Sequence, residues 1–162
     1  MSTRTATDLL ANLTTHELFA VHGALQEELK RREITRTANI VQGIGEYLGN
    51  GMYGGTRFHT AANGMVLTDP QGRRFQIKAR TAGGPDHRRS FPVDPSGHFD
   101  FHVFLMLKPE TFQPVMARCL TRERVRELLK SEKRLSLATV RKEGDDVLAE
   151  AVESWQFAGH GM

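Results

Sequence analysis

The residues best suited to chemistry lie in a predicted β-hairpin. Residues 64–68 predict its first strand, and Asp69-Pro70-Gln71-Gly72 predicts a turn, since proline presets φ and glycine closes it. The second strand, residues 74–80, alternates polar with apolar side chains, as a strand with one buried face does. Its polar face carries Gln76-x-Lys78-x-Arg80, an amide next to two cations, which suits contacts to a phosphate group.

A basic segment begins on this strand and continues beyond it. Residues 73–89 carry six Lys or Arg residues against Asp86 alone, a local net charge of +5, whereas the whole chain has +3. Residues 81–97 are rich in Gly, Pro, Asp, Ser and Arg and predict a long exposed loop. One interpretation of this segment is an ordinary solvated protein surface. Basic side chains in such a loop are, however, suited to phosphate contacts, and we expect double-stranded DNA as the partner. The six basic residues are Arg73, Arg74, Lys78, Arg80, Arg88 and Arg89.

The composition narrows the class of protein. With 162 residues the chain is long enough for one domain with a core, and its pI near 9.3 is mildly basic. Its one cysteine, Cys119, excludes an intrachain disulfide and is interpreted as a small buried apolar residue. No apolar run is long enough for a transmembrane helix, and no secretory signal is apparent, so we expect a cytoplasmic protein that does not contact a membrane.

Several elements must position the hairpin. Thr14 and Glu17 form a capping-box pattern at the start of an N-terminal helix, residues 14–32, with an apolar stripe at Leu18, Val21, Leu25 and Leu29. A second helix is expected at about 37–48, followed by a glycine-rich connector at 49–55, which lacks the spacing of a phosphate-binding loop.

The remainder predicts more of a central sheet. A short strand is expected at 56–59, a strand buried on both faces at 99–107, and its hairpin partner at 112–120. A helix from 121 through 129, a strand at 135–140 and a short helix or strand at 147–155 complete a mixed α/β domain. We predict a single domain, residues 1–158, with an N-terminal helix (14–32), a core (36–130), a C-terminal strand and helix (134–157), and a tail (159–162).

This order of elements resembles the restriction-endonuclease-like superfamily, the PD-(D/E)xK nucleases. More closely, it resembles a group of small bacterial proteins with a Gln-Ile-Lys-x-Arg hairpin. The similarity covers roughly residues 15–130, and Gln76-Ile77-Lys78 is a close variant of the Asp/Glu-x-Lys signature. The resemblance implies a restriction-endonuclease-like core with a central mixed sheet flanked by helices. The matching segments are residues 45–48, 64–66, 76–80, 99–101 and 121–129.

The resemblance also implies a chemistry. In such nucleases acidic oxygens hold Mg²⁺, which activates water and stabilises charge on the scissile phosphate. Glu46, Gln76 and Lys78 would be the catalytic residues, with Glu46 and Gln76 as metal ligands and Lys78 orienting the water or neutralising the phosphate. The family aspartate is absent, because Val66 stands in its place and valine cannot bind Mg²⁺. Asp69 lies several residues away, in the turn.

Three functions remain open on this basis. The leading prediction is a DNA-binding protein of nuclease-like fold with a degenerate metal site. The second is an active Mg²⁺-dependent DNA endonuclease of a restriction or repair type. The third is a protein-interaction module in defence or counter-defence, whose N-terminal helix offers a face for a homodimer or another partner. His98 and His102, four residues apart, are interpreted as core or surface histidines rather than as a zinc site.

Overall fold

The computed structural model describes residues 5–36, 39–60, 64–83, 90–94 and 97–160. The chain divides into two compact units, Met1–Ala38 and Asn39–Met162. None of the described helices is both long and apolar enough to cross a membrane.

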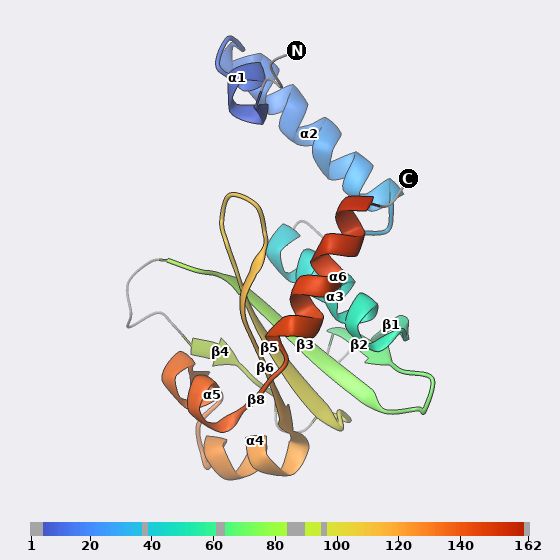
Figure 1. Cartoon of the computed structure of the whole chain (residues 1–162), viewed down its shortest axis with the longest axis vertical. Helices are drawn as coiled ribbons and strands as arrows, with labels where there is room; N and C mark the ends of the chain where they lie inside the picture. Colours follow the sequence, from blue (N-terminus) through green and yellow to red (C-terminus); the bar gives the residue numbers. More distant parts are fainter. Residues whose placement is uncertain (1–4, 37–38, 61–63, 84–89, 95–96, 161–162) are drawn as a thin grey trace. The chain divides into compact units, whose positions relative to one another are not determined.

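The N-terminal unit consists of α1 (Ala6–Leu10) and α2 (Thr15–Arg31) (Figure 1). α2 confirms the predicted helix and its capping box, in which the Thr14 hydroxyl accepts from the Glu17 N–H while the Glu17 carboxylate accepts from the Thr14 N–H. α1 was not predicted, although it begins with a second capping box between Thr5 and Asp8. Neither helix contains a buried residue.

The second unit is built on a mixed sheet, which confirms the mixed α/β class. Within the described residues the sheet has six strands in the order β1-β2-β3-β5-β6-β8, and β3 and β5 are its parallel pair. β4 (Ser90–Pro92) and β7 (Arg134–Ser136) form a separate two-stranded sheet. The strands of the large sheet are β1 (Thr56–Thr60), β2 (Gly64–Thr68), β3 (Arg74–Thr81), β5 (Phe101–Leu107), β6 (Pro114–Thr121) and β8 (Asp145–Asp146).

Helices cover both faces of this sheet (Figure 1). α3 (Ile40–Tyr53) and α6 (Leu148–His160) pack on one face, and α4 (Arg122–Leu129) and α5 (Leu137–Glu143) pack on the other. The strand β5 contributes to the hydrophobic cores on both faces of the sheet. Val103 and Leu105 pack in the core beneath α3 and α6, whereas Phe104 and Met106 pack in the core beneath α4 and α5. The prediction of a strand buried on both faces is therefore confirmed.

α3 corrects the predicted connector at 49–55, because the helix continues to Tyr53 and ends at Gly54 with a left-handed φ of 61°. Glycine is kept inside this helix because its neighbours lie so close. A Cβ at Gly45 would overlap that of Ala79, and one at Gly49 would lie 2.7 Å from the Ile77 side chain. The glycines that predicted a break in the helix are what let it pack against β3.

Three further predictions need correction. The expected strand at 135–140 ends at Ser136, whose side chain caps α5 by accepting from the Thr139 N–H. The predicted loop 81–97 contains β4, with Phe91 and Val93 buried because they complete the core beneath α4 and α5. Of residues 147–155, for which a helix or a strand was expected, 148–155 belong to α6, which runs to His160, so the expected tail is wrong at 159 and 160.

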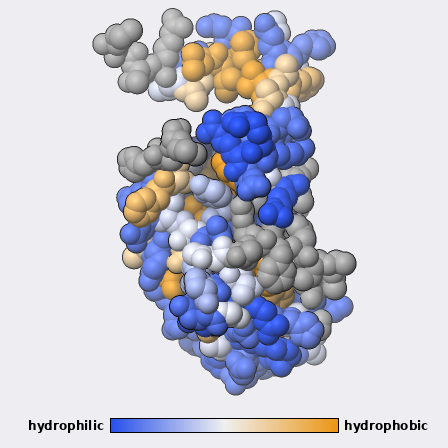
Figure 2. Space-filling model, turned by 90° about the vertical axis from the view of Figure 1, so that its right-hand side faces the viewer, coloured by the Kyte–Doolittle hydropathy of each residue, from blue (hydrophilic) through white to orange (hydrophobic). Residues whose placement is uncertain are grey.

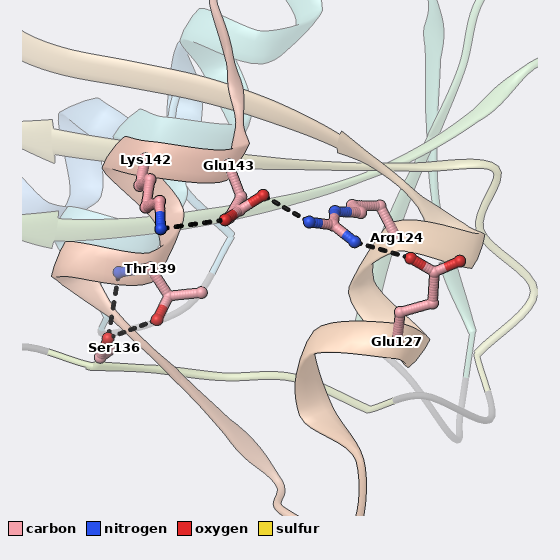
Figure 3. A network of polar contacts seen from close by, with 6 residues as sticks. All are labelled: Arg124, Glu127, Ser136, Thr139, Lys142 and Glu143. Atoms are coloured by element: carbon pink, nitrogen blue, oxygen red, sulfur yellow. Dashed lines mark hydrogen bonds and ion pairs between the residues drawn. The ribbon is translucent and has the colours of Figure 1, made fainter.

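α4 and α5 are joined by a network of ion pairs (Figure 3). Arg124 contacts Glu127 at 2.7 Å within α4 and Glu143 at 2.5 Å at the end of α5, and Lys142 lies 4.0 Å from Glu143. These partly exposed pairs orient the two helices, while Val125 and Val140 beneath them supply the apolar burial. Cys119 on β6 is half-buried, and burial raises the pKa of its thiol to about 11, which makes the thiol unreactive.

The contact between α3 and β3 predicts a position-specific effect of adding one methyl group. Gly45→Ala should lower the free energy of unfolding of the second unit by ~1–3 kcal/mol, because the helix must move away from Ala79. Gly23→Ala in α2 is the matched control, since nothing lies within 4 Å of its added Cβ. Urea unfolding followed by fluorescence of Trp155, the chain's one tryptophan, measures the change. An unchanged transition for Gly45→Ala would contradict the close contact.

Candidate functional site

The candidate site lies at one edge of β3, which the Gln42 side chain of α3 reaches from the face of the sheet. In the described part of the hairpin, β2 pairs with β3 at Leu67–Phe75 and Thr68–Arg74, at the start of β3. Further along, the side-chain amide of Gln42 takes the place of a neighbouring strand: its Nε2 donates to the Ile77 carbonyl at 2.6 Å, and its Oε1 accepts from the Ala79 N–H at 3.1 Å. One amide thus fixes α3 to this edge of the sheet.

A cavity of about 420 Å³ opens beside this edge. Glu46, Gln76 and Lys78, the three predicted catalytic residues, all line it, so the structure brings them together from a helix and a strand. Glu46 is held in place by Gln42, whose Nε2 donates to its Oε1 at 3.0 Å. The other lining residues are Asn39, Gln42, Ile77, Ala79, Arg80, Phe91, Pro92 and Arg134.

Lys78 is the half-buried cation of this site. Burial lowers the pKa of its ammonium group, and the nearby carboxylates of Glu46 and Asp94 oppose that shift. Lys78 also lines a second hollow of about 460 Å³, together with Pro92, Val93, Asp94 and Lys133. A partly desolvated ammonium that faces two openings attracts an anion more strongly than a fully hydrated one does.

Gln76 and His102 are two buried polar side chains close to Lys78. They are register partners on the parallel strands β3 and β5, and they are only 3% and 2% exposed. The Gln76 Oε1 and the His102 Nδ1 both lack a hydrogen-bond partner within the described protein. Burial lowers the pKa of His102 to about 4, and the positive charges of Lys78 and Arg122 add to that shift.

His102 therefore stays neutral at neutral pH and is buried, so of the two expected settings, core or surface, it occupies the core. Its ring packs edge-on to Phe99, with centroids 5.7 Å apart, and lies parallel to Phe104 at 6.4 Å. His98, by contrast, is exposed.

The ligands available to a metal at this site are few. Glu46 supplies one carboxylate and Gln76 one neutral amide oxygen, whereas Val66 is buried and has no donor atom. Asp69 does not replace the missing acid, because its carboxylate accepts from the backbone N–H groups of Gln71 and Arg73 and from the Arg73 guanidinium. No group of three or more His, Cys, Asp or Glu side chains placed to hold a metal occurs among the described residues.

Of the predicted DNA-binding basic residues that the structure describes, Lys78 and Arg80 line the cavity, whereas Arg73 and Arg74 do not. Arg80 lines the cavity and donates to the Ser90 carbonyl. Arg73 pairs with Asp69 at 2.7 Å and lies over the rings of Phe75 and Phe101. Arg74 contacts Asp100 at 3.5 Å. Arg88 and Arg89 lie outside the described residues.

Sequence reasoning missed Arg134, Lys133 and Asp94. The Arg134 guanidinium donates to the Ser90 hydroxyl at 2.7 Å and to the Ser90 carbonyl at 3.1 Å, which holds it at the cavity beside Arg80. Pairing of β4 with β7 brings these residues together, with Ser90 level with Ser136. No local pattern indicates this, because β7 is three residues long and lies far from β4 in the sequence.

A scan of the sequence against protein-family models gives no match, and a search among curated proteins finds no significant relative. The site is therefore interpreted from its own geometry.

The buried His102 predicts a dependence of stability on pH. The unfolded chain takes up the histidine proton near the ordinary pKa of 6.5, whereas the folded chain does so only near 4. Between these values the unfolded state binds more protons, so acidification should lower the free energy of unfolding by up to ~3 kcal/mol.

Urea unfolding measured at steps from neutral pH to pH ~4.5 tests this expectation. His102→Phe, which suits the surrounding rings, should flatten the dependence in this range, and His22→Ala on exposed α2 should leave it unchanged. Wild-type stability that stays constant across the range would show that His102 is not held neutral.

Proposed function

We propose that the protein binds double-stranded DNA through its phosphate groups, and that its second unit is a restriction-endonuclease-like domain with a degenerate metal site. The observation that carries this proposal is the placement of Lys78, Arg80 and Arg134 around one cavity, beside Glu46 and Gln76. Three cations against one carboxylate give this cavity a net positive charge, and phosphate contacts dominate the affinity of proteins for DNA.

The order of elements supports the nuclease-like fold. Glu46 lies on the glycine-rich helix α3, the Gln-Ile-Lys-Ala-Arg segment lies on the second strand of a hairpin, and the helix α4 follows β5 and β6. This is the order implied by the resemblance to the PD-(D/E)xK nucleases. The approach of Glu46 to Lys78 across the α3–β3 contact is what such a site requires.

The residue types support a degenerate metal site. Extended by one residue, the register of β2 and β3 would bring Val66 level with Gln76, the two positions where the nucleases keep their metal-binding acids. An alkyl group and a neutral amide replace two carboxylates there. Mg²⁺ prefers charged oxygen ligands, so Glu46 alone would hold it weakly.

One observation favours a second candidate, Mg²⁺- or Mn²⁺-dependent hydrolysis of DNA. Asp94 lies near enough to Lys78 to influence its pKa, and it lines the second hollow. If Asp94 supplies the acid that is missing at Val66, then Glu46, Gln76 and Lys78 would carry out catalysis together with it. Cleavage that requires Asp94 as well as Lys78 would identify this candidate.

Binding of DNA at the cavity predicts a response to removal of each cation. Lys78→Met and Arg134→Gln should each weaken the binding of a duplex of about 25 bp at least ~10-fold and reduce the slope of log K against log salt by about 1. Fluorescence anisotropy between ~50 and ~200 mM salt measures both quantities. Lys108→Met, at an exposed position after β5, is the matched control. Equal affinity for all three variants would exclude the cavity as the DNA site.

Degeneration of the metal site predicts that activity can be restored. Val66→Asp combined with Gln76→Glu should give Mg²⁺- or Mn²⁺-dependent nicking of plasmid DNA, and Mn²⁺ should raise the melting temperature of this variant more than that of the wild type. Adding Lys78→Met should abolish nicking without removing the thermal shift. A folded double variant that shows neither response to metal would argue against descent from a nuclease.

A further inference from the structure

The second unit is suited to a polar or charged ligand. In the view of Figure 2 its surface is mainly hydrophilic, whereas apolar side chains gather over the N-terminal unit. Its cavity is lined by charged and amide side chains, with Phe91 and Pro92 as part of an apolar wall. The charged groups therefore decide which ligand fits.

Two arginine side chains of the cavity converge on a single backbone oxygen. Arg80 on β3 and Arg134 on β7 both donate to the Ser90 carbonyl, and Arg134 also donates to the Ser90 hydroxyl at 2.7 Å. The two guanidinium groups therefore lie side by side, although like charges repel each other. Ser90 is neutral, so it fixes their positions without balancing their charge. An anion placed against the pair relieves this repulsion.

Arg134 has donors to offer such an anion. Its Nε donates to the Ser90 hydroxyl and its Nη2 to the Ser90 carbonyl, whereas a guanidinium has five N–H donors. Arg134 is exposed, and Lys78, which lines the same cavity, is half-buried. A group that contacts both of these cations as well as Arg80 must enter the cavity that they line.

The charge of the cavity matches a doubly charged anion. Its three cations oppose one carboxylate, a net charge of +2 among the described lining residues. The adjoining hollow adds Asp94 and Lys133, whose charges cancel. A phosphate monoester carries about −1.5 to −2 at neutral pH, because its second pKa is near 6. A phosphodiester carries only a single negative charge and would leave part of the positive charge unbalanced.

The shape of the cavity also favours a phosphate at the end of a chain. Its volume of about 420 Å³ lies in the range of pockets that enclose small ligands. An internal phosphodiester continues into a sugar on both sides, so it reaches only the mouth of such a pocket. A terminal phosphate is attached on one side, and its three free oxygens can enter and accept from several cations.

We propose that this cavity binds a phosphate monoester, and that the protein holds DNA at a phosphorylated end. Arg80 and Arg134 together bind two of the phosphate oxygens, Lys78 binds the third, and Ser90 positions the two arginines. This inference rests on the proposed function, because it names the ligand of the same cavity. A free mononucleotide carries the same group as a phosphorylated DNA end, and the experiments separate these two sources.

Fluorescence anisotropy with one duplex sequence of about 25 bp tests the preference for an end. The duplex is prepared with phosphates at its 5′ or 3′ ends, with hydroxyl ends only, and with both ends closed by hairpin loops. One of the phosphorylated forms should bind at least ~10-fold more tightly than the hydroxyl and closed forms. Equal, measurable affinity for all forms would overturn the inference and leave DNA binding itself intact.

A free mononucleotide distinguishes failure of this inference from failure of the proposed function. Isothermal titration calorimetry compares deoxyadenosine monophosphate with deoxyadenosine. If no duplex binds but the monophosphate alone does, DNA binding is wrong and the monoester site stands, with a free nucleotide as its ligand. If neither a phosphorylated duplex nor the monophosphate binds, or if deoxyadenosine binds equally well, the monoester site is wrong.

Substitutions test whether the preference arises in this cavity. Lys78→Met and Arg134→Gln should lower the ratio of affinities for phosphorylated and hydroxyl ends at least ~5-fold, whereas Lys108→Met should preserve it. Ser90→Ala removes no charge, so it should lower this ratio ~3-fold and leave the dependence on salt unchanged. The unfolding transition of Trp155 checks that each variant is folded. A ratio that Lys78→Met and Arg134→Gln both preserve would overturn the inference.

Discussion

The candidate site depends on one amide group, the side chain of Gln42, which completes the edge of β3. Its contacts to the Ile77 carbonyl and the Ala79 N–H satisfy two backbone groups that a further strand would otherwise pair. A buried backbone group left without a partner costs about 1–3 kcal/mol, so this contact matters on the scale of a whole domain's stability. It also requires α3 to lie close to β3, and Gly45 and Gly49 permit that distance. Glu46, one turn after Gln42, is thereby brought to the cavity.

Two opposing effects act on the pKa of the Lys78 ammonium group. Burial disfavours its charge, while Glu46 and Asp94 favour it, and the net effect is a lowered pKa. The nearby His102 stays neutral because burial lowers its pKa, and because the positive charges of Lys78 and Arg122 add to that shift. The buried oxygen of Gln76 and the Nδ1 of His102 have no protein partner, and an unpaired polar atom in a buried site is costly. Because the Gln76 oxygen accepts hydrogen bonds, the atom that satisfies it must be a donor or a cation, so Lys78 is the group here that would attract an anion.

The sequence by itself determined the elements whose signals are local. The capping box at Thr14 and the apolar run of β5 depend on neighbouring residues, and both were predicted correctly. The alternation predicted for β3 is wrong at Gln76, which is buried like Phe75 and Ile77 because it lies level with the buried His102 of β5. The three candidate catalytic residues were also chosen from sequence, through the resemblance. Only the tertiary structure decided that α3 continues through Gly49 and Gly51, because the reason is the nearness of Ile77 and Ser154 on other elements. It also brought Arg134 and Asp94 to Lys78, since the short strands β4 and β7 acquire their neighbours through long-range pairing that no local pattern encodes.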